Sequence, residues 1–317
     1  MRIHVDTWDP GYGSALSGED GGSRSDARVD IGVETREWTP ITPVPSSEAR
    51  LIRLVDGVRR IDARLWVDAL DEPGPPALGV AASYAAGVVT CDLTAGSADV
   101  TVALVERGLF SANPLPVLAS RGATYRSFAV GRDDPSELDA ALQARLRELE
   151  IRAATEAGGG HDLLIVDGPL RGRTSLSRVL GYIKTHRAQY LPPSVLGVVG
   201  ALAGGQRTPI FRLGSSWERL TWYVKLPGGG ASPWAGVVRV ECPPDLDVAE
   251  AVSLADLSAV TLPRLASNAY KDPRAPQNLL PIGGLERRLR SLLGDARLLL
   301  RSLRAATEGT MEPTPNV

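Results

Sequence analysis

The sequence predicts an α/β domain built on a mixed sheet, and three observations lead to this class. Residues 59–70 alternate apolar and polar side chains, which is the period of a half-buried strand, and 78–93 and 100–110 continue with small and β-branched residues. Between 135 and 157 the apolar residues recur at helical spacing instead. The run 162–167 is apolar without alternation, as expected of a strand that is covered on both faces. Strands that alternate with helices in this way favour a sheet flanked by helices.

The N-terminal region reads as an irregular arm followed by a strand. The stretch 9–26 is rich in Gly, Ser and Asp, so we expect residues 1–48 to lack regular structure. The first strand is expected at 49–55, with Asp56-Gly57 ending it. Asp-Gly and Pro-Gly pairs between the following apolar segments predict an antiparallel meander.

The middle of the chain predicts one long helix and a strand behind it. Asp134 or Ser136 can cap the helix over 135–157, and the glycines at 158–160 end it. After the apolar run at 162–167, a further helix or strand is expected over 174–186.

The C-terminal third completes the list of expected elements. Further strands are expected at 195–202, 219–226 and 235–242. A last helix is expected at 284–306, because leucines fall on one face of it and arginines lie on or beside the other. One domain is therefore expected over 49–306, followed by a disordered tail at 307–317.

Composition narrows the class of protein. The chain has 317 residues, 43% hydrophobic and 23% charged, so it can bury a real core. A net charge of −2 excludes a global basic field, so any surface that binds nucleic acid must be local. Two cysteines, Cys91 and Cys242, are too few for a disulfide framework or a thiolate zinc site and favour a reducing cytoplasm. We expect no signal peptide and no membrane span, because residues 1–30 are polar and no run of about 18 apolar residues occurs.

Two apolar runs of the chain stop at Asp-Gly, at Asp56 and at Asp167. A carboxylate at the end of a strand points into the crevice at the carboxyl edge of the sheet, where open α/β sheets bind ligands. Two unpaired carboxylates on neighbouring strands would repel each other, and a divalent cation removes that conflict. Carboxylate oxygens suit Mg²⁺ or Mn²⁺.

Asp-Gly is also a common hairpin turn, and Asp56 lies between two expected strands. For Asp56 the turn and the metal ligand therefore both stay open. The sequence "PLRGR" after Asp167-Gly168 is less typical of a hairpin and favours a ligand there.

The helix over 135–157 offers a third acid. Glu150 shares its inward stripe with Leu142, Leu146 and Leu149, and a carboxylate in that place is costly unless something binds it. Glu150 is therefore either a third metal ligand or a residue at the edge of the stripe that pairs with an arginine.

Lys184 and His186 follow in "GYIKTH". If this segment is a strand that returns to the same crevice, Lys184 can hold a scissile phosphate; if it is a surface helix, Lys184 is an ordinary solvated lysine. His186 is either a metal ligand or base, or a structural histidine.

Arginines and aromatic residues near these elements could bind phosphates and stack on bases, or could be solvated arginines beside core aromatics. The residues concerned are Arg171, Arg173, Arg207, Arg212, Phe211, Trp217, Trp222 and Tyr223.

The order of these pieces resembles the NurA nuclease family. The likeness covers about residues 48–300 and is carried by a strand ending in "VDG", a helix with Glu, the strand "LLIVDGPL", then "GYIKTH", "RTPIFRL", "WYVKL" and "WAGVVRVE". The resemblance implies an RNase H-like core, cleavage of DNA with Mn²⁺ or Mg²⁺, a homodimer, and work beside a HerA-like hexameric ATPase in end resection.

The same resemblance assigns roles to four residues. It places the family's metal-binding acids at Asp56, Glu150 and Asp167, and its lysine at Lys184. The family's histidine at the last helix has no counterpart, since Gly283 or a neighbour takes its place. Gln277 or Asn278 could supply an oxygen ligand instead.

Three functions are therefore compatible with the sequence. The first is a metal-dependent deoxyribonuclease. The second, suggested by the missing histidine, is a catalytically degenerate NurA-like adaptor subunit. The third is an actin-like phosphotransferase, whose glycine-rich phosphate loops are not found at the required places.

Overall fold

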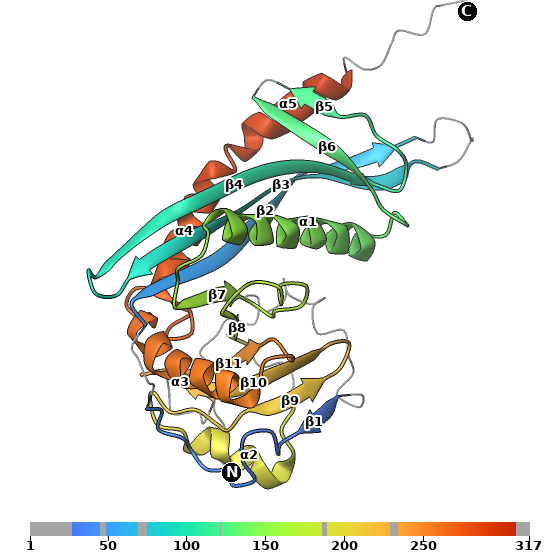
Figure 1. Cartoon of the computed structure of the whole chain (residues 1–317). Coiled ribbons are helices and arrows are strands. Elements are labelled where there is room, and N and C mark those ends of the chain that lie inside the picture. Colours follow the sequence, from blue (N-terminus) through green and yellow to red (C-terminus); the bar gives the residue numbers. More distant parts are fainter. Residues whose placement is uncertain are drawn as a thin grey trace, which may run out of the picture. The chain divides into compact units, whose positions relative to one another are not determined.

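The computed structural model describes residues 27–44, 49–68, 75–120, 122–185, 189–228 and 234–308. Within these residues, groups of strands are separated by helices: six strands precede the first helix, and three helices follow the last strand (Figure 1). This mixture of strands and helices confirms the predicted α/β class. By its internal contacts the chain divides into two compact units. Unit 1 comprises residues 1–55, 89–99 and 158–284, and unit 2 comprises residues 56–88, 100–157 and 285–317.

Unit 1 is built on a mixed sheet in the order β1-β9-β10-β11-β8-β7-β2. The strands are β1 (Arg28–Asp30), the first part of β2 (Leu51–Val67), β7 (Leu163–Asp167), β8 (Val179–Ile183), β9 (Phe211–Gly214), β10 (Glu218–Lys225) and β11 (Val237–Cys242). The pairs β2·β7 and β7·β8 are parallel, whereas the pairs from β8 through β11, β10 and β9 to β1 are antiparallel. The mixed sheet expected from the sequence is thus confirmed.

Two helices belong entirely to unit 1. The first, α2 (Pro193–Ala201), corrects the strand predicted at 195–202. Proline at the start of the segment is compatible with a first helical turn, and Val199 is buried while Val195 and Leu196 pack beside it in one core cluster. A short apolar run suits either a strand or a helix. Here the residues that pack inward recur at helical spacing, and the segment is a helix.

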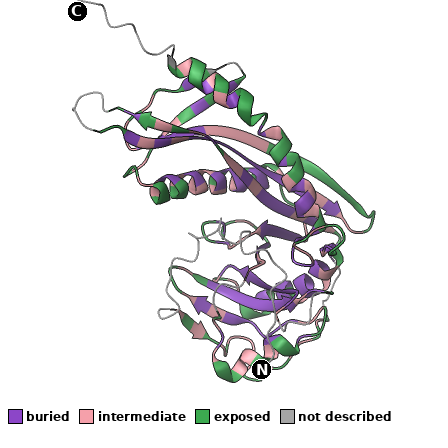
Figure 2. Cartoon of the chain, turned by 180° about the vertical axis from the view of Figure 1, so that it is seen from behind, coloured by how far each residue is buried: buried purple, intermediate pink, exposed green. Residues whose placement is uncertain are grey.

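The second helix of unit 1, α3 (Val248–Leu265), was not predicted. Asp247 caps it by accepting a hydrogen bond of 2.8 Å from the Glu250 backbone N–H. Many small residues on its buried face, such as Ala251, Ala255 and Ala259, dilute the apolar period in the sequence. Figure 2 shows how strongly buried residues concentrate on the strands of this unit.

Unit 2 has the strand order β2-β3-β4-β6-β5. Its strands are the second part of β2, most of β3 (Ala77–Asp92) and β4 (Ser97–Ser111), β5 (Leu118–Ser120) and β6 (Ala123–Ala129). The predicted helix is confirmed as α1 (Pro135–Glu156), with Asp134 as its cap, and Figure 1 shows it lying along β2, β3 and β4.

Strand β2 corrects the prediction that Asp56-Gly57 ends a strand. The strand continues without a break from Leu51 to Val67, so no hairpin forms at this dipeptide. Gly57 serves a different purpose: a Cβ atom there would lie 2.6 Å from Glu150 Oε1 and 2.7 Å from Leu146 Cδ1 of α1. A larger residue at this position would therefore require the buried side chains of Leu146 and Glu150 to shift.

The predicted C-terminal helix is in fact two helices, α4 (Leu280–Leu292) and α5 (Ala296–Glu308). The break occurs at Gly294, whose φ of +80° is incompatible with a continuing right-handed helix. Asp295 then caps α5, accepting a hydrogen bond of 2.9 Å from the Leu298 backbone N–H.

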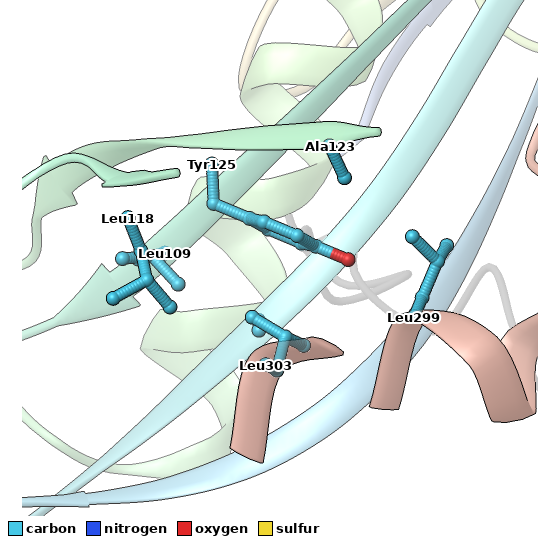
Figure 3. Packing of buried hydrophobic residues seen from close by; sticks show 7 residues of the cluster. Leu109, Leu118, Ala123, Tyr125, Leu299 and Leu303 are labelled. Carbon is cyan, nitrogen blue, oxygen red and sulfur yellow. The ribbon is translucent and has the colours of Figure 1, made fainter. Parts of the chain in front are cut away.

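Helix α5 closes a core cluster of unit 2 (Figure 3). Leu299 and Leu303 of α5 pack with Leu109, Leu118 and Tyr125 of the sheet, and all five side chains are buried. The Tyr125 hydroxyl donates to the buried carboxylate of Asp62 at 2.9 Å; burial, together with this carboxylate, raises the pKa of Tyr125 to about 12.

Both ends of the chain are only partly described. Within the arm predicted to be irregular, β1 forms a strand on β9, and residues 9–26 lie outside the described residues. At the other end α5 extends to Glu308, and residues 309–317 lie outside them as well. None of the described helices combines the length and apolar character that a membrane span requires.

Candidate functional site

Asp167 is the last residue of β7, between two parallel neighbours, β2 and β8. It lies opposite Tyr182 in the ladder, and Gly168 closes the ladder by exchanging backbone hydrogen bonds of 2.9 and 3.1 Å with Tyr182. The prediction that a strand ends at Asp167-Gly168 is therefore confirmed, and the carboxylate stands at the carboxyl edge of the sheet.

Lys184 follows β8 and is ion-paired with Asp167. Its Nζ atom donates to Asp167 Oδ2 and, at 2.8 Å, to Asn278 Oδ1. Both side chains of the ion pair are largely buried, with 11% of Lys184 and 15% of Asp167 exposed. The alternative in which "GYIKT" is a returning strand is thus the right one, and it brings the lysine to the second of the two predicted aspartates.

Asn278 is fully buried and links Lys184 to a second acid, Asp272. Its Nδ2 atom donates to Asp272 Oδ2 at 2.6 Å. Burial raises the pKa of Asp272, but the hydrogen bonds from Asn278 and from the Arg274 backbone and side chain outweigh it and bring that pKa below its usual value. Asp272 therefore stays ionised, and it fixes which way the Asn278 amide points.

Asp56, in unit 2, is buried, and its Oδ1 atom accepts a hydrogen bond of 2.7 Å from the Gly57 backbone N–H. One of its carboxylate oxygens lies within 4.8 Å of an oxygen of Glu286 in α4. Two acids at this spacing could share a cation, as the sequence predicted for Asp56, but the partner in unit 2 is a residue that was not predicted.

Glu286 had a signal in the sequence that was missed. It stands four residues after Ile282 and three before Leu289, both fully buried, so helical geometry turns it toward the inward stripe of α4. Only 13% of its side chain is exposed, and its Oε2 atom lies 3.8 Å from Arg290 Nη2.

The ladder between β2 and β7 relates the two predicted aspartates by register. Val55 pairs with Val166, and the next residue along each of these parallel strands is Asp56 and Asp167 respectively. In both strands, therefore, an Asp directly follows the last paired Val of the ladder.

Glu150 faces inward from α1, as predicted, and only 4% of it is exposed. Its Oε1 atom occupies the space against Gly57, directly after Asp56. Among the described residues it does not join the group of acids whose oxygens are close enough to share an ion.

The other candidates divide between core and structural ion pairs. Phe211, Trp222 and Tyr223 are at most 1% exposed, so the alternative in which they are core aromatics is correct. Arg207 is equally buried between Glu34 and Asp256, at 2.8 and 2.6 Å. His186 lies outside the described residues.

Of the remaining arginines and aromatics, Arg173 is buried and donates to the Pro169 carbonyl at 2.7 Å. Arg212 is partly exposed and donates to the Pro244 carbonyl at 3.2 Å, and Trp217 lies under the Arg219 guanidinium. Arg171 is exposed.

The sequence and the structure of the chain are similar to those of known proteins. Residues 81–282 match the NurA domain. The structure is similar to the crystal structure of the NurA nuclease from Sulfolobus solfataricus, with a TM-score of 0.52 and 11% identity over 88% of this chain and 89% of that chain. It also aligns with the catalytic domain of human endonuclease V, with a TM-score of 0.32 and 18% identity over 78% of this chain and 85% of that one. No curated protein matches the sequence.

The domain match spans well over half of the chain, and the fold expected from the resemblance is confirmed. The chain belongs to the NurA family.

Proposed function

We propose that this protein is a nuclease that hydrolyses the phosphodiester bonds of DNA with the help of a divalent cation held by Asp56, Asp167 and Glu286. Membership of the NurA family supports the nuclease class. The observation that carries the metal assignment is the pairing of Val55 with Val166 in the β2·β7 ladder, since Asp56 and Asp167 are the next residues of these two parallel strands.

The donor set fits a hard cation. All three proposed ligands are carboxylates, and oxygen ligands suit Mg²⁺ and Mn²⁺ better than metals that prefer thiolate or imidazole. Glu286 would also replace the missing histidine of the family, because it offers a ligand from the C-terminal helical region in which that histidine is expected. Glu150, which the resemblance made a ligand, would act from beside Asp56 through its place against Gly57.

Such a cation would lower the pKa of a bound water and offset the charge that develops on the phosphate. The protein's own contribution is to supply the carboxylates and to keep Lys184 beside Asp167. With its ammonium group at Asp167, Lys184 is placed to donate to a non-bridging phosphate oxygen.

Replacing Asp167 tests this proposal. Asp167→Asn keeps the shape of the side chain but removes its charge, so we expect Mn²⁺-dependent cleavage of DNA to fall by about 10²-fold or more. The matched control is Asp99→Asn on the exposed part of β4, which should cleave at the wild-type rate. Equal rates for the two variants would refute the assignment.

The adaptor alternative keeps the fold but abandons catalysis. It was motivated by the missing histidine, and the buried Glu286 on α4 now weighs against it. Calorimetric titration with Mn²⁺ separates the two functions, since an adaptor with a decayed centre should bind no metal while the nuclease should bind it and lose that binding in Asp167→Asn. The family match gives no support to an actin-like phosphotransferase.

The family resemblance also supports the wider setting. We propose that the protein forms a homodimer and works beside a HerA-like hexameric ATPase in DNA end resection and repair in the cytoplasm. Sedimentation of the purified chain alone, and then with a HerA-type ATPase, tests both associations.

A further inference from the structure

Lys184 has a long, flexible side chain, so its ammonium group needs partners to hold it in one place. The structure supplies two: Asp167 Oδ2, which is the proposed metal ligand, and Asn278 Oδ1 at 2.8 Å. Asn278 is neutral, so it fixes the direction of the Lys184 side chain without adding charge to the proposed metal site.

The orientation of the Asn278 amide is itself determined. Its oxygen accepts from an ammonium group, which cannot accept, and its nitrogen donates at 2.6 Å to the Asp272 carboxylate, which cannot donate while it is ionised. Rotating the amide by half a turn would therefore place donor against donor and acceptor against acceptor. Asp272 is held in turn by the Arg274 backbone N–H at 2.8 Å.

The oxygen of Asn278 is accordingly engaged with Lys184, which argues against the expectation that it serves as a metal ligand. Asn278 is fully buried, and it leads from the loop that carries Asp272 into α4, the helix of Glu286. A buried amide with both of its polar atoms matched to charged groups is a strong positioning element.

We infer that Asn278, held by Asp272, is a positioning residue that aims the Lys184 ammonium group at the phosphate bound beside Asp167. The inference rests on the proposed nuclease function and deepens it, since it assigns to Asn278 and Asp272 a role in substrate activation that acts through the lysine alone.

A double-mutant cycle tests this. Lys184→Met should lower kcat for Mn²⁺-dependent DNA cleavage by about 10²-fold, the effect of removing one preorganised donor to the developing charge. Asn278→Leu, close in size, should lower kcat by about tenfold or more, because a misaimed donor loses much of its effect. In the Lys184→Met background, Asn278→Leu should cause no further loss.

The controls separate positioning from general damage. Lys271→Met removes an exposed lysine of the same region and should leave kcat unchanged. If Asn278→Leu does not fold, as judged by its thermal transition, Asp272→Asn replaces it in the cycle, because that change removes only the charge that orients the amide. It too should lower kcat in the wild type and have no effect beside Lys184→Met.

Several outcomes would overturn the inference. If Asn278→Leu lowers kcat equally in both backgrounds, Asn278 has a structural role. If Asn278→Leu keeps the wild-type kcat, the residue does not position the lysine. If Lys184→Met keeps the wild-type kcat, the lysine does not act on the phosphate. These outcomes are distinct from failure of the proposed function, in which the wild-type protein itself neither binds Mn²⁺ nor cleaves DNA.

Discussion

At Gly57 the side chains of Leu146 and Glu150 occupy the space that a methyl group would need. Gly57→Ala would place its Cβ against Leu146 Cδ1 and Glu150 Oε1 of α1. We expect this variant to lose about 1–3 kcal/mol of unfolding free energy, the usual range for overpacking a filled site. Urea denaturation measures the loss.

Gly131→Ala is the matched control for this prediction. No atom lies within 4 Å of a Cβ at that position, and its φ is not in the left-handed range. We expect a change of no more than about 0.5 kcal/mol. Similar losses in both variants would show that the close approach at Gly57 is not what requires glycine.

The two Asp-Gly dipeptides show what a single residue can and cannot reveal in the sequence. Asp167-Gly168 ends a strand as predicted, whereas Asp56-Gly57 lies inside one. Side chains of α1, about ninety residues further along the chain, pack into the space beside Gly57. Short-range patterns predict that helix but contain no information about which strand it packs against. Lys184 was predictable as a candidate, but its bond to Asn278 joins residues far apart in sequence.

At the scale of elements, the break between α4 and α5 depends on the backbone of one glycine. Gly294→Ala forces a side chain into φ +80°, so we expect a loss of about 1–2 kcal/mol of unfolding free energy. Gly284→Ala, within α4 and with open space around its Cβ, should instead gain up to about 1 kcal/mol. Thermal unfolding of the two variants should show shifts of opposite sign.

The elements differed in how far they could be predicted. Helix α1 and the strands around it were found because their periods are long and clear. Residues 195–201 lie in a helix although their composition suits a strand equally, and α3 was missed because alanines make up much of its buried face. In both cases packing against a sheet, which no local window contains, determined the structure.

At the scale of the whole molecule, acid should weaken unit 1 through carboxylates that accept backbone hydrogen bonds. The Asp162 side chain accepts from the Leu51 and Arg50 N–H groups, at 2.9 and 2.7 Å, and the first of these is the main cause that lowers its pKa. The pKa of Asp272 is lowered as well. A lowered folded-state pKa gives stability that is complete above the unfolded value of about 3.9 and is lost as the pH falls through the folded value.

We therefore expect the free energy of unfolding to fall as the pH is lowered from about 4, the range just below the unfolded pKa. In Asp162→Asn this fall should be shallower, because one of the titrating carboxylates is gone. Denaturant melts at a series of pH values measure the slope. The same slope in both proteins would mean that Asp162 does not contribute to acid sensitivity.

The pairing of β1 with β9 has a practical consequence for anyone who shortens this protein. A chain started at residue 49, where sequence patterns place the domain's beginning, would discard both β1 and Glu34. Arg207 would keep one acid of its two, and β9 would present an unpaired edge to other molecules. Truncated versions that begin there should come out of purification as aggregates, while those that retain Ala27 onward should stay dispersed.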